Sequence, residues 1–109
     1  MKVDSGGWAV EPSELAGVLA ALSNPQRLRI LASLAEGRNY VSQIARDIQL
    51  GRPLVHMHLQ RLEAARLVTG RLELSVDGKA LKYYELQQFQ IVITPEAVVA
   101  ATAALDPET

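Results

Sequence analysis

The stretch that decides the fold reads VSQIARDIQLGRPLVHMHLQRLEAAR and covers residues 41–66. Its apolar spacing predicts a short helix capped by Ser42, after which Leu50-Gly51 turns the chain. The inward-facing residues of this helix are Ile44, Ala45 and Ile48. Pro53 suits the first turn of a second helix, which we expect to run to about Ala65. A helix, a short turn with glycine and a second helix together predict a helix-turn-helix.

Two more helices are predicted on the amino-terminal side of this unit. Asn24 can cap a helix that begins at Pro25 and ends at Gly37. Its expected inner stripe is Leu28, Leu31, Ala32 and Ala35, widened by Ile30 and Leu34. The apolar spacing of residues 12–22 predicts a further helix, and we expect residues 1–11 to form a flexible lead.

A β-hairpin is predicted on the carboxyl-terminal side. Apolar and polar residues alternate over residues 71–76, and Asp77-Gly78 favours a two-residue hairpin turn. This turn would place Leu74 opposite Leu81, Leu72 opposite Tyr83 and Glu73 opposite Lys82. The hairpin therefore has the form of a wing beside the helix-turn-helix.

The last part of the chain, residues 87–109, is predicted to contain a short strand and a final helix. Phe89, Ile91 and Ile93 alternate with polar or smaller residues, and Thr94-Pro95 can start the helix. The expected fold class is mainly α with a small β-wing: one winged helix-turn-helix domain over residues 1–109, with its core at residues 24–86 and a flanking helix at each end.

Composition and charge limit the possible functions. The chain has 109 residues, of which 49% are hydrophobic, and it has no cysteine, so we expect one core without disulfides or thiolate metal sites. No apolar run approaches the ~20 residues of a membrane span and no leader opens the chain, which predicts a cytoplasmic protein. Residues 38–82 carry eight basic and four acidic residues, and acidic segments flank them. This asymmetry suggests an anionic partner for the middle of the chain.

Several segments resemble the ArsR-type family of winged-helix regulators. They are ALSNPQRLRIL (residues 21–31), VSQIA (41–45), VHMHLQRLEAA (55–65) with Leu67-Val68, and residues 78–86. The resemblance implies a homodimeric, sequence-specific DNA-binding transcription regulator. It also implies a recognition helix at residues 53–65 and a wing at residues 71–82.

The chain departs from the family pattern in three places. Members often cap the recognition helix with Ser followed by Gln-Ser-Thr, where this chain has Gly51-Arg52-Pro53-Leu54, and Arg66 stands where Gly usually ends that helix. The thiolate metal-sensing motif of many members has no counterpart in residues 42–50. We therefore do not expect arsenic sensing.

Contacts to DNA are expected from the outer face of the recognition helix and from the wing. At about 100° per residue, Val55, Leu59 and Leu62 face inward. The outer face, which would enter the major groove, consists of Pro53, Met57, Gln60 and Ala64, with His56 and Arg61 at its margins. Arg52 can contact a guanine edge or a phosphate, and Gln60 can pair with adenine. The predicted set is Arg52, Pro53, His56, Met57, Gln60 and Arg61 on the helix, and Arg71, Lys79 and Lys82 on the wing. The alternatives are a solvated helix face and a charged hairpin edge.

Metal chemistry and catalysis find little support in the sequence. His56 and His58 are two positions apart, so on a helix they point in directions about 200° apart and cannot chelate one ion. We expect His58 to pack against the helix of residues 25–36 or the wing. The acidic residues are scattered and no glycine-rich phosphate loop is present, so we predict no cofactor and no enzymatic activity.

The two flanking helices are predicted to form a dimer interface. Its residues would be Leu15, Val18, Leu19, Leu22, Val98, Ala101 and Leu105, although these helices could instead fold back on their own subunit. The sequence thus predicts a homodimeric repressor that binds double-stranded DNA, with no membrane partner and no assignable small-molecule effector. The alternative is a protein-interaction module that docks a partner through Leu54 and Met57.

Overall fold

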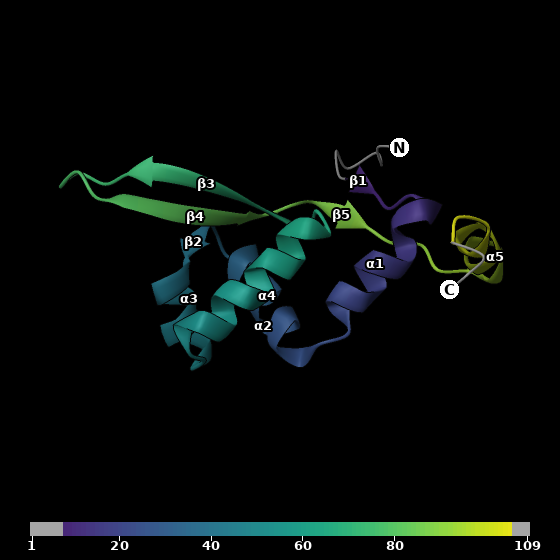
Figure 1. Ribbon diagram of the computed structural model, residues 1–109, viewed down its shortest axis with the longest axis horizontal. Helices are drawn as coiled ribbons and strands as arrows, with labels where there is room; N and C mark the ends of the chain where they lie inside the picture. Colours follow the sequence, from purple (N-terminus) through teal and green to yellow (C-terminus); the bar gives the residue numbers. More distant parts are fainter. Residues whose placement is uncertain (1–7, 106–109) are drawn as a thin grey trace.

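The computed structural model describes residues 8–105 and has the winged helix-turn-helix architecture that the sequence predicts (Figure 1). The helices are α1 (Pro12–Leu22), α2 (Pro25–Ala35), α3 (Val41–Ile48), α4 (Arg52–Ala64) and α5 (Pro95–Ala103). The strands are β1 (Trp8–Ala9), β2 (Asn39–Tyr40), β3 (Val68–Leu74), β4 (Ala80–Leu86) and β5 (Phe89–Gln90). Helices α3 and α4 form the helix-turn-helix, and β3 and β4 form the wing.

Short-range signals set where the helices begin. The side chain of Asn24 accepts hydrogen bonds from the backbone N–H groups of Gln26 at 2.9 Å and Arg27 at 3.1 Å, as predicted for the cap of α2. The hydroxyl of Thr94 accepts from the N–H of Ala97 at 3.0 Å and caps α5. Helix α3 starts earlier than expected, because Tyr40 rather than Ser42 is its N-cap residue.

The core lies where α2, α3, α4 and β4 meet, and it includes the fully buried Ile44, Leu59 and Tyr84. The predicted inner stripe of α2 is wrong in part. Ile30, Leu31 and Leu34 are buried, whereas Leu28 is 51% exposed. Ala32 and Ala35 are also exposed. The periodicity allowed two overlapping stripes, and packing buries the one with Ile30 and Leu34, since large side chains remove more apolar area from water than alanines do.

Strands β2, β4 and β3 form an antiparallel sheet in that order, and the predicted register of the wing is wrong by one residue. Leu72 pairs with Lys82, Glu73 with Leu81 and Leu74 with Ala80. The hairpin loop has three residues between Ser75 and Lys79 instead of two, and Gly78 adopts a φ of 84° within it. The hydroxyl of Ser75 accepts from the N–H of Lys79 at 3.1 Å and so stabilises this longer turn.

The expected flexible lead is wrong for Trp8 and Ala9, which form a strand parallel to β5. The N–H of Trp8 donates to the carbonyl of Gln88 at 2.7 Å, and that of Val10 donates to Gln90 at 3.1 Å. The partner strand lies about eighty positions further along the chain, so no local pattern indicated it. Residues 1–7 of the predicted lead are outside the described part of the chain.

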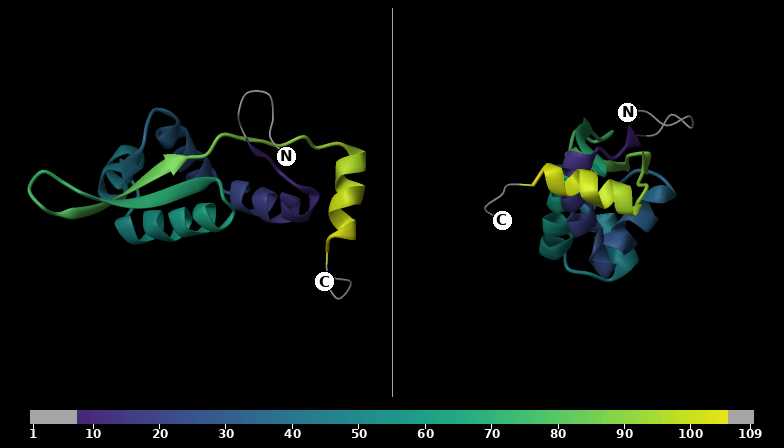
Figure 2. Two further views of the ribbon diagram at one scale, coloured as in Figure 1. Left: turned by 90° about the horizontal axis from the view of Figure 1, so that it is seen from above. Right: turned by 90° about the vertical axis from the view of Figure 1, so that its right-hand side faces the viewer.

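The molecule is elongated, with extents of 51 × 30 × 21 Å. The wing reaches out at one end, and α5 lies crosswise at the other end, where it packs against α1 (Figure 2). No residue of α5 is buried. None of the helices in residues 8–105 is long and apolar enough to cross a membrane.

Candidate nucleic-acid interface

Helix α4 separates a buried face from an exposed one, as its periodicity predicts. Val55, Leu59 and Leu62 are fully buried, and His58 lies beside them on the same side. All six predicted contact residues on this helix are exposed: Arg52, Pro53, His56, Met57, Gln60 and Arg61. Leu54 adds an exposed apolar side chain near the first turn. The structure therefore brings the predicted helix residues onto the solvent side of one helix.

The amino-terminal end of α4 can accept negative charge. Its N-cap residue is Gly51, and no side chain among residues 8–105 caps the free N–H groups of the first turn. That turn has no acidic residue, and it begins with the guanidinium of Arg52. Free N–H groups, the positive end of the helix dipole and an arginine at one helix end favour a phosphate there.

Helix α3 contributes a basic side chain that the sequence prediction left out. Arg46 is exposed in its last turn, and its Nη2 donates to the Oε1 of Gln43 at 2.6 Å. The Nε2 of Gln43 donates in turn to Asp47 at 2.8 Å. The first helix of a helix-turn-helix crosses the DNA backbone, so the sequence could have indicated a DNA contact for an arginine on this helix.

The wing presents two of its three predicted basic residues freely. Arg71 and Lys79 are exposed, and within residues 8–105 neither takes part in an ion pair. The Nζ of Lys82 instead lies 3.6 Å from the Oε1 of Glu63 on α4 and 5.2 Å from the centre of the Tyr84 ring. Lys82 therefore attaches the wing to α4.

The predicted pair between Glu73 and Lys82 is wrong. Glu73 accepts from the Nη1 of Arg38 at 2.5 Å, and the Arg38 guanidinium lies 4.5 Å from the centre of the Tyr83 ring. This hydrogen bond holds the pKa of Glu73 below its ordinary value. The register shift separates Glu73 from Lys82, since Glu73 now stands opposite Leu81.

His58 is buried, and its Nδ1 has no hydrogen-bond partner in the part of the chain that the structure describes. Burial lowers the pKa of His58, and the positive charges of Arg27 on α2 and Arg61 on α4 lower it further. The helix that carries His58, α4, packs against α2. No group of three or more potential metal-binding side chains occurs within the described residues.

The predicted dimer residues divide into buried and exposed ones. Leu15 and Val18 are already buried within the single chain, and their part in the interface stays a prediction. Leu22 and Ala101 are half-buried. Leu19, Val98 and Leu105 are 37%, 49% and 50% exposed, respectively. The sequence prediction missed Val92, Ile93 and Val99, whose exposed side chains extend the same apolar end of the molecule.

A helix-turn-helix whose second helix exposes Arg52 and Arg61, together with an adjoining wing, defines a winged helix-turn-helix protein with a DNA-binding fold. Comparison with known proteins gives the family. The chain belongs to the family described as bacterial regulatory protein, arsR family, whose model matches residues 24–69. It is therefore a transcriptional regulator of the ArsR family.

Known relatives are regulators rather than enzymes. An uncharacterized HTH-type transcriptional regulator of Methanocaldococcus jannaschii is 36% identical over 78 residues, which cover 72% of this chain and 81% of the relative. The solution NMR structure of a homodimeric winged helix-turn-helix DNA-binding domain from Mycobacterium bovis, a possible ArsR-family regulator, is 29% identical. It covers 83% of this chain and 74% of that chain, with a TM-score of 0.60. The transcriptional repressor BigR from Xylella fastidiosa is 26% identical over 83% of this chain and 78% of its own, with a TM-score of 0.57.

Proposed function

We propose that the protein is a homodimeric, sequence-specific DNA-binding repressor that acts in the cytoplasm, has no enzymatic activity and does not sense metals through thiolates. The observation that carries this proposal is the positive charge of Arg52, Arg71 and Lys79 on the exposed face of α4 and on the wing, where none of the three takes part in an ion pair within residues 8–105. Unpaired surface cations on a winged helix-turn-helix are suited to a polyanion.

Each surface has a separate role in the proposed complex. Arg52, Gln60 and Met57 read base edges in the major groove, and Pro53, His56 and Arg61 border them. Arg71 and Lys79 contact phosphates from the wing. Lys82 acts through its ion pair with Glu63, because that pair holds the wing against α4.

The proposed dimer uses α1 and α5. Helix α5 has nine residues and buries none of them, and isolated helices of this length are marginal in water. A second copy would cover the exposed apolar side chains of Leu19, Val98 and Val99. The homodimeric relative supports the formation of a dimer. Two recognition helices about 34 Å apart would then read a palindromic site.

Repression follows most simply from occupancy of a promoter, and the relative named as a transcriptional repressor supports it. The chain has no cysteine, so no thiolate can bind a metal ion, arsenite or an oxidant. The signal that releases the protein from DNA therefore has a different chemistry.

A salt titration tests DNA binding directly. We expect the affinity of the protein for duplex DNA, measured by fluorescence anisotropy, to fall steeply with salt, with a log-log slope near −5 for about six phosphates. Lys79→Gln should make this slope shallower by about 2 in a dimer, since one phosphate contact is lost from each subunit. A flat response would contradict the proposal and favour a protein partner for Leu54 and Met57.

A further inference from the structure

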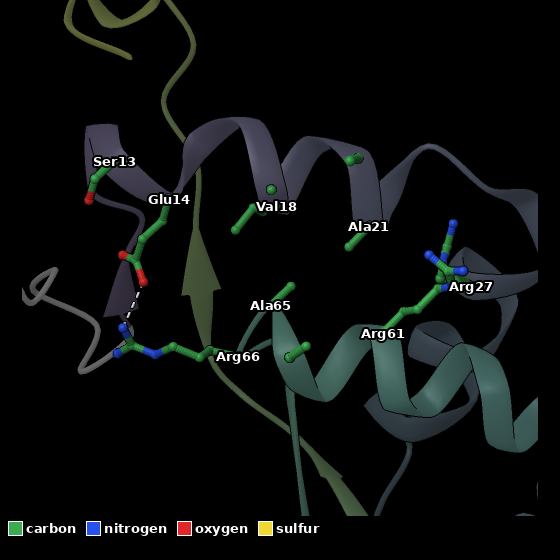
Figure 3. A pocket seen from close by; sticks show the side chains of 11 residues that line it. Ser13, Glu14, Val18, Ala21, Arg27, Arg61, Ala65 and Arg66 are labelled. Carbon is green, nitrogen blue, oxygen red and sulfur yellow. Dashed lines mark hydrogen bonds and ion pairs between the residues drawn. The ribbon is translucent and has the colours of Figure 1, made fainter. Parts of the chain in front are cut away.

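A cleft lies between α1 and the carboxyl-terminal half of α4, next to the first turn of α2 (Figure 3). Its volume is about 420 Å³, which is within the usual range for small-molecule sites. Small residues form much of the wall: Gly17, Ala20, Ala21, Ala64 and Ala65. Three arginines also line it, namely Arg27, Arg61 and Arg66. The cleft thus combines an apolar wall with a high density of positive charge.

The three arginines differ in their partners. The Nη1 of Arg66 lies 2.6 Å from the Oε2 of Glu14, and its guanidinium also covers the ring of Trp8. By contrast, the side chains of Arg27 and Arg61 make no hydrogen bond and no ion pair within residues 8–105, and the Nε of Arg27 is buried without a partner. Figure 3 shows Arg27 and Arg61 toward one end of the cleft that both line, with the Glu14–Arg66 pair toward the other.

Two guanidinium groups that line one cleft without partners among residues 8–105 are unfavourable in this position. They repel each other, and Arg27 stands in the first turn of α2, where the helix dipole is also positive. Their combined charge is felt by the buried His58, whose pKa is lowered by burial and by both arginines. A bound anion would remove this repulsion and would supply the missing acceptor for the Nε of Arg27.

We propose that this cleft binds a small organic carboxylate with a compact apolar body. The carboxylate accepts hydrogen bonds from Arg27 and Arg61, and the apolar body packs against Ala21, Ala64 and Ala65. The small wall residues leave the space for this body, and the two free guanidinium groups match the two oxygens of one carboxylate.

The ligand would touch both α1 and the recognition helix, because Arg61, Ala64 and Ala65 belong to α4 or its end. Binding can therefore change DNA affinity, and this regulatory consequence rests on the proposed function. The binding step does not, since it needs only the cleft.

Calorimetric titration of the full chain with benzoate, without DNA, tests the binding step. We expect saturable binding with a Kd of about 1 mM or tighter, as suits a ligand of this size. Arg27→Gln and Arg61→Gln should each weaken benzoate binding about tenfold or more, since each removes a charged hydrogen-bond donor. The matched control is Arg29→Gln on the same helix as Arg27: Arg29 is exposed, bonds Gln26 at 3.1 Å and does not line the cleft. It should leave benzoate affinity unchanged.

A steric variant separates binding from folding. A Cβ at Gly17 would meet no atom within 4 Å, so Gly17→Leu should fold, as circular dichroism would verify, while its side chain fills the cleft and abolishes benzoate binding. Absence of saturable benzoate binding to the native chain, or an equal loss in Arg29→Gln, would overturn the proposal. A second result would also overturn it: Arg27→Gln weakens the affinity for DNA or the dimer, while benzoate binds neither the native chain nor the variant. The cleft would then hold a phosphate of DNA or a second copy of the chain.

Discussion

At the residue scale, Arg52 and Lys79 are both exposed cations, but they stand at different parts of the proposed interface. Arg52 begins the recognition helix, whereas Lys79 lies at the tip of the wing. Arg52→Ala should cost about 1–3 kcal/mol of binding free energy and relax the preference at one base position. Lys79→Ala should instead weaken binding to all DNA sequences about equally. Binding to a set of duplexes with single-base changes measures both effects. A change of sequence preference in Lys79→Ala would show that the wing also reads bases.

His58 is also expected to make stability depend on pH. Its pKa in the folded chain is lowered from the ordinary value of 6.5, mainly by burial and further by Arg27 and Arg61. The unfolded chain therefore binds a proton at His58 more readily than the folded chain does. The contribution of His58 to the free energy of unfolding should be fully present above pH 6.5 and should be lost as the pH drops below that value.

Urea unfolding at a pH of about 7.5 and about 5.5 measures this dependence while the carboxylates stay charged. His58→Leu should remove most of the difference between the two midpoints. His56→Gln, a matched change at an exposed position, should preserve it. If His58→Leu kept the full dependence, another group would be responsible.

At the element scale, the contact between α4 and the wing depends on close approach at Gly70. The Oε2 of Glu63 accepts from the N–H of Gly70 at 3.2 Å. A Cβ at Gly70 would clash with the side chain of Lys82 and lie 3.1 Å from the ring of Tyr84. Lys82 could move aside, but the ring belongs to a fully buried residue and would have to shift by a few tenths of an ångström within the core.

Gly70→Ala should therefore lower the free energy of unfolding by about 1–3 kcal/mol. Gly17→Ala is the matched control, because its Cβ has free space in the middle of α1 and replaces the weak helix former glycine. It should raise the same free energy by about 0.5–1 kcal/mol. Chemical denaturation measures both changes, and equal effects of the two substitutions would contradict the crowding at Gly70.

At the scale of the whole molecule, the proposed dimer covers the exposed apolar side chains at the α5 end. Val98 and Val99 are 49% and 68% exposed, so their replacement should not disturb the single chain. The double substitution Val98→Ser with Val99→Ser should lower the dimer fraction, since each buried valine contributes roughly 1.5–3 kcal/mol. DNA affinity should fall with it, because a single half-site binds weakly.

Sedimentation velocity at micromolar concentration, with Glu96→Gln on the same helix as the control, measures the dimer fraction. A native chain that sediments as a monomer under these conditions would rule out the interface. An unchanged dimer in the double variant would place the interface on α1 instead of α5.

The sequence by itself determined the helices, the helix-turn-helix and the face of α4 that is exposed. The predicted helix of residues 12–22 has the same bounds as α1, and the caps at Asn24 and Thr94 form as expected. These features were predictable because helical periodicity and capping involve residues only two to four positions apart.

Contacts between distant residues were decided only by the tertiary structure. The strand at Trp8 needs a partner about eighty positions away, the partner of Lys82 is Glu63 rather than Glu73, and the loop hydrogen bonds of Ser75 shift the wing register. The cleft was also decided by the tertiary structure, because Arg27 and Arg61 line one cleft only when α2 and α4 pack against each other. Side-chain pattern restricts which face of an element is buried, but the three-dimensional packing of all elements selects the neighbours that each face meets.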